Sequence, residues 1–555
     1  MKRWKRSVSV VALVALASAA VACSSKDEPD AADSTSPSPV ATASPTTQAD
    51  PGTEPTSPPE DAPASTVPEG TDAPATTAPA DELRGGTIIL AAVAPPPSLD
   101  PAASMWGPLS AYYELTYDTL LRVGPGGEII PWLATEWTYD ESRTELTLTL
   151  RDDVTFSDGS ALTAEVAVAN LQRFKDGTAS TAVKLAGVTG IEAPDATTVV
   201  ITLAAPDPGL LTAISQEAGL IASGEALDDP DLATAPVGSG PYVLDTDATV
   251  IGSSYVYERN ADYWNPDAQY FDSIVVRTGM DPIAAGNAMK AGEVDVAQLN
   301  LEVEPIATEA GWTIEEVNTG GFQGLMLFDR AGQLNPALGD VRVRQAINHA
   351  LDRPLLIEAM NSLGEPTVQI MPMAGGIYDP ALEDVYPYDP DRARELLTEA
   401  GYPDGVTIEM PDLGQRDSWV FLEQALADAG ITIAWKESTV DQSIGDIVTA
   451  KYGAVYFALG GPTAWDTIQQ VVSPAAAFNP FRSQDPALDE LIAQFQTGDA
   501  EAQTDAARQI NQWIVDNAWF APVAASFSLV GTSRRVALAE PTTQTFPSIY
   551  DLRPA

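Results

Sequence analysis

The sequence has one cysteine and one histidine, Cys23 and His349, among its 555 residues. A single cysteine cannot close a disulfide within the chain, so no disulfide framework holds this fold. One thiol and one imidazole also fall short of the roughly four nitrogen or sulfur ligands that a structural zinc ion needs. A Ser–His–Asp or Cys–His catalytic set would have to use His349, which lies in a helical pattern and is expected to be structural. We therefore expect no metal and no cofactor.

Positive charge is scarce as well. The chain has 29 Lys and Arg residues against 78 Asp and Glu, a formal net charge of -49. Such a chain repels nucleic acid and anionic lipid headgroups, so neither is expected as a partner. Long hydrophobic runs are also missing: the run Ser7–Ala22 is shorter than the roughly 20 residues of a membrane-spanning helix, and no later run approaches that length.

The N-terminal residues have the pattern of a secretory signal. Met1–Arg6 reads MKRWKR, and Ser7–Ala22 is apolar and small. The AVAC at Ala20–Cys23 resembles a bacterial lipoprotein box, in which the cysteine is lipidated and becomes the new N-terminus, although Ala20 stands where the box usually has Leu. We expect a signal peptide over residues 1–22 and a lipid on Cys23, which holds the protein on the outer face of the cytoplasmic membrane. An ordinary signal peptide with an incidental thiol, or an uncleaved anchor, is the alternative.

Residues 23–84 are almost entirely Ser, Thr, Pro, Ala, Asp and Glu. With so few large apolar side chains, the segment cannot bury enough surface to offset the entropy lost on ordering. It is predicted to be a disordered acidic tether with a reach of roughly 40 Å. Whether it is O-glycosylated stays open.

The body, residues 85–555, is too long for one core and should divide into at least two. Glu145–Ser160 alternates apolar and polar residues with period two, which predicts a strand and a turn. Gly339–Arg353 has a helical stripe that ends before Pro354, and Asp389–Tyr402 has an Asp cap, a Pro at the first turn and a Gly stop. Trp419–Trp435 is predicted as a helix, a Gly stop and a strand. The mixture indicates an α/β fold.

Eight motifs follow one another along this body. They are SLDPA (Ser98–Ala102), YDTLLRVGPGGEIIPWLATEW (Tyr117–Trp137), LRDDVTFSDGSALTAEVAVANLQR (Leu150–Arg173), VGSGPYVL (Val237–Leu244), YERNADYWN (Tyr257–Asn265), AMKAGEVDVAQL (Ala288–Leu299), DVRVRQAINHALDR (Asp340–Arg353) and YDPDRARELLTEAGY (Tyr388–Tyr402). In this order and spacing, the chain resembles the extracytoplasmic solute-binding proteins of ABC importers, family 5, the oligopeptide-, dipeptide- and nickel-binding type.

The resemblance implies a two-lobed periplasmic-binding-protein-like fold of the large class II type, with an extra subdomain in the first lobe. Mapped onto this chain, lobe I is expected at 85–318 with a return at 524–555, the inserted subdomain at about 132–236, and lobe II at 319–523. The ligand would bind between the lobes, which close on it by a hinge motion.

The implied function is that of a lipid-anchored substrate-binding protein. It captures a solute, in the first instance a peptide, and delivers it to an ABC permease, without catalysis and as a monomer. Two other classes stay open: a secreted hydrolase or other enzyme, for which no stretch singles out a carboxylate pair, and a receptor that senses a ligand without import.

Four aromatic residues are candidates for the walls of the binding cleft. They are Trp106 and Tyr113 after the SLDPA motif, Phe322 just past the predicted hinge, and Trp465 in GGPTAWDTIQQ. Aromatic rings suit such walls because they offer a large contact area, and in Trp and Tyr also a polar group. The alternative for each is a place in a hydrophobic core.

Two charged residues complete the predicted site. In dipeptide-binding relatives, an Arg meets the ligand carboxylate and an Asp the ammonium, and Arg416 and Asp466 are the corresponding candidates here. The alternative is a solvated loop position for Arg416 and a helix cap for Asp466. GGPTAWDTIQQ departs from the Gly-Asp-Pro-Asp-like run of peptide-binding members, so the resemblance does not identify the ligand.

Overall fold

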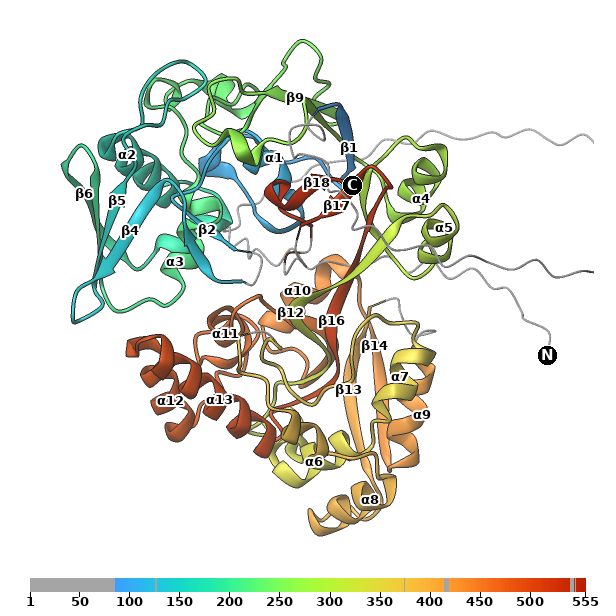
Figure 1. The fold of residues 1–555 in the computed structure, drawn as a ribbon. Coiled ribbons are helices and arrows are strands. Elements are labelled where there is room, and N and C mark those ends of the chain that lie inside the picture. Colours follow the sequence, from blue (N-terminus) through green and yellow to red (C-terminus); the bar gives the residue numbers. More distant parts are fainter. Residues whose placement is uncertain (1–84, 125–126, 374, 414–418, 540–543, 545) are drawn as a thin grey trace, which may run out of the picture. The chain divides into compact units, whose positions relative to one another are not determined.

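The computed structural model describes residues 85–555 apart from 125–126, 374, 414–418, 540–543 and 545 (Figure 1). The predicted signal peptide, Cys23, the predicted tether and Arg416 lie outside the described residues. The predictions made for them are therefore carried forward as predictions.

An eight-stranded sheet joins strands from both ends of the body. Its order is β15-β12-β16-β11-β1-β10-β9-β8. The strands are β1 (Thr87–Ala91), β8 (Tyr242–Leu244), β9 (Ser254–Arg259), β10 (Ser273–Arg277), β11 (Val296–Leu299), β12 (Thr313–Leu327), β15 (Ala454–Gly460) and β16 (Phe520–Thr532). β1 pairs in parallel with β10 and β11, and the other pairs are antiparallel.

The two longest strands, β12 and β16, run side by side (Figure 1). Their pairing shifts register between Asn318 and Phe322, where Thr319 donates from its hydroxyl to the carbonyl of Ser526 at 3.0 Å. The predicted boundaries at 318/319 and 523/524 thus fall inside two paired strands rather than in loops. An irregular pairing bends and twists a strand locally, which is a suitable place for a hinge.

A separate four-stranded antiparallel sheet has the order β4-β5-β7-β6. Its strands are β4 (Ala134–Tyr139), β5 (Glu145–Leu150), β6 (Val188–Asp195) and β7 (Thr198–Leu203), and α2 (Ala164–Lys175) packs on it. Leu146, Leu148 and Leu150 of β5 are buried while Glu145 and Thr149 are exposed, which confirms the period-two prediction for this strand. The whole sheet lies within the sequence range predicted for the inserted subdomain.

In the second half of the body, capping residues set where the helices begin and end. α8 (Pro390–Glu399) begins where Asp389 accepts from the amide of Arg392 at 2.9 Å, as predicted. α9 (Val420–Asp428) is followed by Gly430, with φ of +85°, and then by β14 (Ile431–Glu437), which pairs in parallel with β13 (Val406–Asp412). The helix predicted up to Arg353 ends earlier: α6 (Val341–His349) stops, and Asp352 then caps a new helix, α7 (Arg353–Ala359), with Pro354 in its first turn.

Further elements complete the described chain. They are α1 (Ser110–Glu114), α3 (Leu210–Ile214), α4 (Pro282–Ala291), α5 (Glu304–Glu309), α10 (Val440–Val448), α11 (Ala464–Thr467), α12 (Pro486–Thr497), α13 (Ala500–Asp516) and the short strand pairs β2 (Leu121–Val123) with β3 (Ile129–Pro131) and β17 (Val536–Leu538) with β18 (Leu552–Pro554). Within the described ranges, no helix has the length and apolarity needed to cross a membrane.

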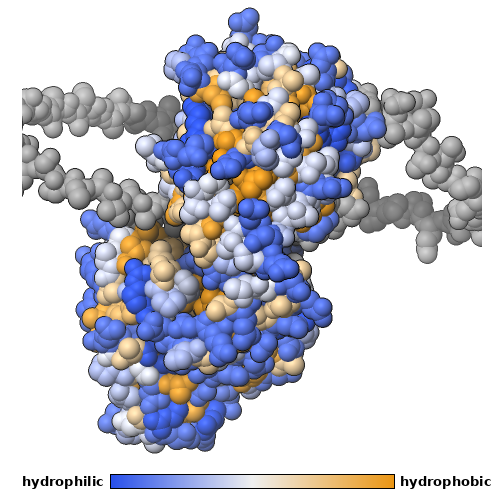
Figure 2. All heavy atoms as spheres, turned by 90° about the vertical axis from the view of Figure 1, so that its left-hand side faces the viewer, coloured by the Kyte–Doolittle hydropathy of each residue, from blue (hydrophilic) through white to orange (hydrophobic). Residues whose placement is uncertain are grey.

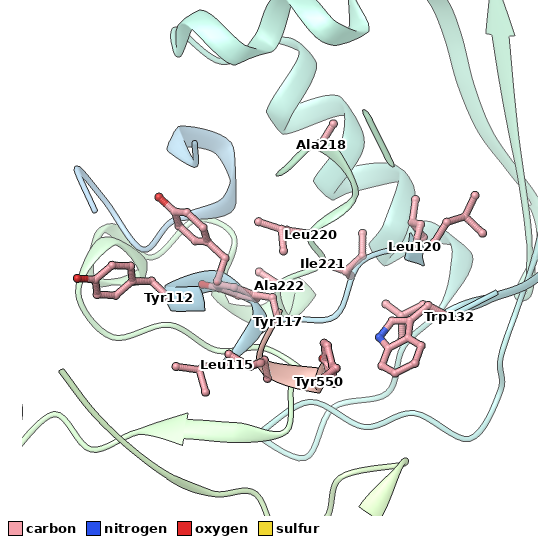
Figure 3. Close-up of a cluster of buried hydrophobic side chains, with 14 of the residues drawn as sticks. Tyr112, Leu115, Tyr117, Leu120, Trp132, Ala218, Leu220, Ile221, Ala222 and Tyr550 are labelled. Carbon is pink, nitrogen blue, oxygen red and sulfur yellow. The ribbon is translucent and has the colours of Figure 1, made fainter. Parts of the chain in front are cut away.

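Several hydrophobic clusters form the interior. The largest contains Tyr112, Tyr117, Leu120 and Trp132 from the start of the body, and also Tyr550 from its end (Figure 3). Two others lie in the second half, one around β13 and β14 and one around α13. More than one core is what the length of the body predicted. On the face shown in Figure 2, hydrophilic residues cover most of the surface, with smaller hydrophobic areas between them.

Candidate functional site

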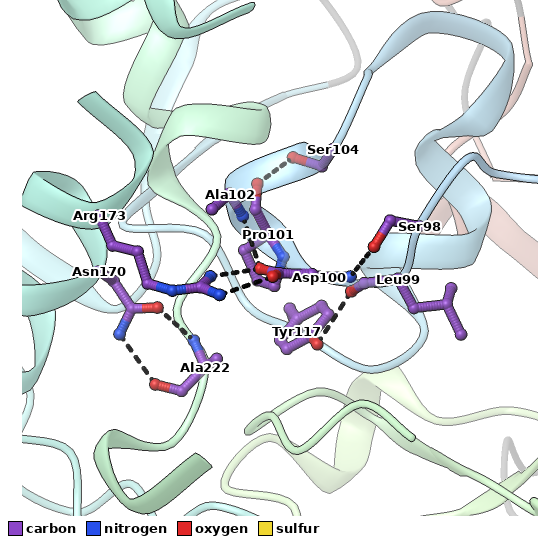
Figure 4. Close-up of polar contacts among 10 residues, drawn as sticks. All are labelled: Ser98, Leu99, Asp100, Pro101, Ala102, Ser104, Tyr117, Asn170, Arg173 and Ala222. Carbon is purple, nitrogen blue, oxygen red and sulfur yellow. Dashed lines mark hydrogen bonds and ion pairs between the residues drawn. The ribbon is translucent and has the colours of Figure 1, made fainter. Parts of the chain in front are cut away.

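The SLDPA motif forms a turn that is tied to α2 (Figure 4). Asp100 accepts from the amide of Ala102 at 2.9 Å and forms a two-pronged ion pair with the guanidinium of Arg173, in which Nη2 and Oδ2 are 2.7 Å apart. Tyr117 donates to the carbonyl of Leu99 at 3.0 Å. These contacts fix the segment that leads into the candidate aromatic residues.

Trp106 is the predicted aromatic residue closest in sequence to this turn. Its side chain is half-buried and lines a small cavity together with Glu114, Arg122 and Tyr550, among others. The cavity is lined by a carboxylate, a guanidinium and three aromatic rings, and its volume of about 10 Å³ is room for about one water molecule. Trp106 is thus partly exposed, beside a cavity that is too small in this structure for a peptide.

Tyr113 and Phe322 occupy core positions. Tyr113 is 0% exposed and donates to the carbonyl of Ser98 at 3.1 Å. Phe322 is 1% exposed and packs edge-on against Phe520, with the ring centroids 5.6 Å apart. In this structure neither ring offers surface to a ligand, and both positions match the alternative considered for the aromatic residues.

Asp466 acts as part of a helix cap. It lies in α11, where its Oδ2 accepts from the hydroxyl of Thr463 at 2.7 Å and from the Thr463 amide at 3.3 Å. The Thr463 hydroxyl in turn accepts from the Asp466 amide at 3.1 Å, which completes a capping box. The carboxylate is half-buried, and the cap uses one of its two oxygens. The geometry between Asp466 and Arg416 is not described, so the predicted clamp stays a prediction.

Trp465 points its indole N–H to another part of the chain. It donates to Oδ1 of Asp207 at 3.2 Å, and its ring stacks on Phe495 with an interplanar angle of 4°. The four aromatic candidates are therefore not gathered in one place: two are buried, Trp106 lines the small cavity, and Trp465 bridges to Asp207.

His349 has a structural environment. Its Nδ1 lies 2.9 Å from the carbonyl oxygen of Pro387, and its ring contacts Tyr386 edge-on. Among the residues that the structure describes, no group of three or more His, Cys, Asp or Glu side chains is arranged to hold a metal ion.

Asp118 is a residue whose role the sequence did not indicate. It is 1% exposed and accepts five hydrogen bonds, all from neutral donors. The donors are Trp132 (2.7 Å), Tyr263 (3.0 Å) and Tyr550 (3.1 Å) on Oδ1, and Ser239 (2.8 Å) and Trp264 (3.0 Å) on Oδ2. Burial raises its pKa, and these hydrogen bonds oppose that effect. Since Asp118 and four of the donors come from the motifs quoted above, a main task of those motifs is to build this buried hub.

A second buried carboxylate, Glu114, fastens the C-terminal segment. It accepts from the hydroxyl of Ser548 and from the amide of Ile549, each at 3.0 Å. Burial raises its pKa to about 7, and Arg122 opposes the shift. The sign that could have revealed both residues is a carboxylate within an otherwise apolar run, Tyr112–Leu121.

Comparison with known proteins identifies the family. The sequence matches the bacterial extracellular solute-binding proteins, family 5 Middle, over residues 128–474, more than half of the chain. The glutathione-binding protein GsiB of Escherichia coli (strain K12) is 29% identical over 318 residues, which cover 54% of this chain and 59% of that protein. The chain thus spans less than two thirds of the length of this relative.

Two solved structures have the same fold. HbpA2 from Haemophilus parasuis superimposes with a TM-score of 0.76 at 21% identity, over 85% of this chain and 100% of its own. The periplasmic binding protein DppA from Helicobacter pylori, in complex with the peptide STSA, gives a TM-score of 0.69 at 22% identity, over 85% and 99%. The predicted two-lobed α/β fold is thereby confirmed. Together with the family match, this shows that the chain belongs to family 5 of the bacterial extracellular solute-binding proteins.

Proposed function

We propose that this protein is the substrate-binding component of an ABC importer, which captures a peptide or peptide-like solute and delivers it to a membrane permease. The observation that carries the proposal is the family match over residues 128–474. The ligands named for two similar proteins, glutathione and the peptide STSA, are both peptidic and support this substrate class. The protein acts by binding and release and performs no chemistry on its ligand.

The location proposed for it is the outer face of the cytoplasmic membrane. Residues 1–22 act as a signal peptide, Cys23 carries the lipid, and residues 24–84 connect the lipid to the body. In this arrangement the protein is a monomer whose contact with the membrane is made by the lipid alone.

For ligand contact, we propose Trp106 together with Arg416 and Asp466. Arg416 would grip a ligand carboxylate with two parallel hydrogen bonds, and Asp466 would accept from a ligand ammonium. The oxygen of Asp466 that the cap leaves free supports the second role, because capping and ligand contact can then coexist. Tyr113 and Phe322 are left out of this set, because both rings are buried in cores.

Mass spectrometry of ligand released from the purified, denatured protein tests the substrate class. Calorimetry with glutathione and with the tetrapeptide Ser-Thr-Ser-Ala then measures affinity. Stoichiometric binding of a peptide without product is the expected result, whereas turnover of the peptide would favour the enzyme alternative. A released ligand that is not peptidic would overturn the substrate class.

The clamp has its own test. Arg416→Ala and Asp466→Asn should each weaken binding of the released peptide at least tenfold, about 1.4 kcal/mol. Thr463→Ala is the matched control, since it breaks the capping box but leaves both charged groups in place. Its effect should appear in stability, by about 1 kcal/mol, and not in affinity. If both charge variants bind as wild type does, the clamp is wrong.

A further inference from the structure

Two segments that are distant in sequence meet at Trp465. One is Pro206–Gly209, the loop between β7 and α3, and the other comprises α11 and the end of α12. The indole N–H of Trp465 donates to Oδ1 of Asp207 at 3.2 Å, and the side-chain amide of Gln496 donates to the carbonyl of Pro206 at 2.7 Å. These residues are 258 and 290 positions apart in the chain.

The contact is shaped for this pair of segments. A Cβ atom added to Gly209 would lie 2.8 Å from Cδ1 of Trp465, closer than real side chains approach. Only glycine lets the loop come this near the indole ring. On the other side, the Trp465 ring is held by parallel stacking on Phe495, which is 6% exposed. The indole is therefore in a fixed orientation when it reaches Asp207.

Each side of the contact belongs to a different hydrophobic cluster. Leu210, next to Gly209, packs in the largest cluster, whereas Phe495 packs in the cluster around α13. The loop lies in the range predicted for the inserted subdomain, and Trp465 and Gln496 lie in the range predicted for lobe II. Because the contact is held by two hydrogen bonds and each cluster lies on its own side of it, the two segments can separate without exposing either core.

We propose that Pro206–Gly209 on one side, and Trp465 with Gln496 on the other, form a latch that holds the inserted subdomain against lobe II. The lobes can part only after the latch has released. The rate at which the latch opens therefore limits the rate at which ligand enters and leaves. This last step rests on the proposed function, since it requires a ligand that is bound and released between the lobes. The role assigned to Trp465 becomes that of a positioning residue instead of a wall of the ligand site.

Variants that loosen the latch test the proposal directly. They are made in the full-length protein, from which bound ligand is removed by denaturation and dialysis. Gly209→Val should raise the radius of gyration measured by X-ray scattering, and amide exchange in residues 205–215 and 463–472 should speed up at least tenfold. Gly187→Val is the matched control: it lies in the same predicted subdomain, and an added Cβ meets no atom within 4 Å. This control should leave both measurements unchanged.

Two milder variants keep the test decisive if Gly209→Val fails to fold. Trp465→Phe retains a ring that can stack on Phe495 but removes the indole donor, and Gln496→Ala removes the second hydrogen bond. Gln494→Ala, on the exposed side of the same helix, is the control for the latter. Faster exchange in the two latch segments for both variants supports the latch, and unchanged exchange and radius overturn it.

The scattering and amide-exchange measurements use no ligand, so they test the latch independently of the proposed function. Calorimetry with glutathione and Ser-Thr-Ser-Ala, which tests the function, can fail while the latch variants still open the protein. With a bound peptide in hand, the latch further predicts that Trp465→Phe raises the dissociation rate at least threefold. An unchanged dissociation rate would contradict the claim that the latch slows ligand release, even if the variants were shown to open the protein.

Discussion

Asp100 and Arg173 form an ion pair that joins two of the sequence motifs, 73 residues apart. Asp100 belongs to SLDPA and Arg173 ends the long motif that contains α2. Their side chains are 17% and 32% exposed, so water screens the pair less than it screens a surface ion pair. Asn170, one turn earlier on α2, exchanges two hydrogen bonds with the backbone of Ala222. The helix is thereby fixed by polar contacts at two positions on one face.

Removing the guanidinium should therefore destabilise the body. Arg173→Met leaves a partly buried carboxylate without its ion-pair partner and should lower the free energy of unfolding by about 1–3 kcal/mol. Urea unfolding measures it. Arg277→Met is the control, because both members of the Arg277–Glu293 ion pair are more exposed, at 37% and 59%, and the pair should contribute less than about 1 kcal/mol. Equal losses for the two variants would contradict a special role for the Asp100–Arg173 pair.

Glu114 should make stability depend on pH. Burial raises its pKa from 4.5 to about 7, so the folded protein holds this proton more tightly than the unfolded chain does. Stability from this group is therefore full below about pH 4.5 and is lost as pH rises through 7. The loss amounts to about 3 kcal/mol, and this figure already includes the opposing effect of Arg122 on the pKa of Glu114.

Glu114→Gln isolates this contribution, because an amide oxygen can still accept from Ser548 and Ile549. Measured by urea unfolding, the wild type should lose stability relative to the variant between pH 5 and pH 8. The same slope in both proteins would show that Glu114 does not titrate in this range. Burial also raises the pKa of Asp118, but Asp118 is present in both proteins, so its effect on stability cancels in the difference between them.

The proposed lipid attachment predicts a change of location. Cys23→Ala should release the protein into the medium or leave the precursor uncleaved, because no other cysteine can take the lipid. Fractionation with N-terminal sequencing measures both outcomes. A correctly cleaved variant that stays on the membrane would rule out Cys23 as the attachment point.

The composition of residues 24–84 predicts that they add no folding energy. A protein that starts at Gly85 keeps the first described contacts, in which the amides of Gly85 and Gly86 donate to Tyr270 and Asp272. Its melting temperature should stay within about 1 °C of the full chain, because about 1 kcal/mol shifts the melting temperature by roughly that amount in a body of this size. A larger fall would mean that the segment packs on the body.

The sequence predictions that the structure confirms were based on local patterns. The alternation in Glu145–Leu150, the Asp cap of α8 and the Gly stop after α9 depend on residues within one element, and each was readable from the chain. The break between α6 and α7 was missed because the same apolar spacing continues across it. There, the cap formed by Asp352 overrides the periodicity.

Long-range relationships were not predictable in this way. Nothing near Tyr113 or Phe322 in sequence distinguishes a ring in a core from a ring on a cleft wall; the difference is made by Ser98 and Phe520, which fold onto them. Arg344 is a similar case. It reads as the polar side of a helix, yet it is 6% exposed and donates to the carbonyls of Asn517 and Ala518 at the end of α13. The negative end of that helix dipole supplies its counter-charge.

The position of β16 has a consequence for the order in which the chain can fold. This strand, Phe520–Thr532, stands between β12 and β11 in the eight-stranded sheet, although it follows β11 by more than 200 residues in the chain. Before β16 is made, β11 has only β1 beside it, and the segment of β12 that pairs only with β16 has no partner strand. Contacts between residues so distant in sequence form slowly. The nascent chain therefore cannot complete this sheet until β16 has been synthesised, and that delay is time in which an unfolded chain can be exported.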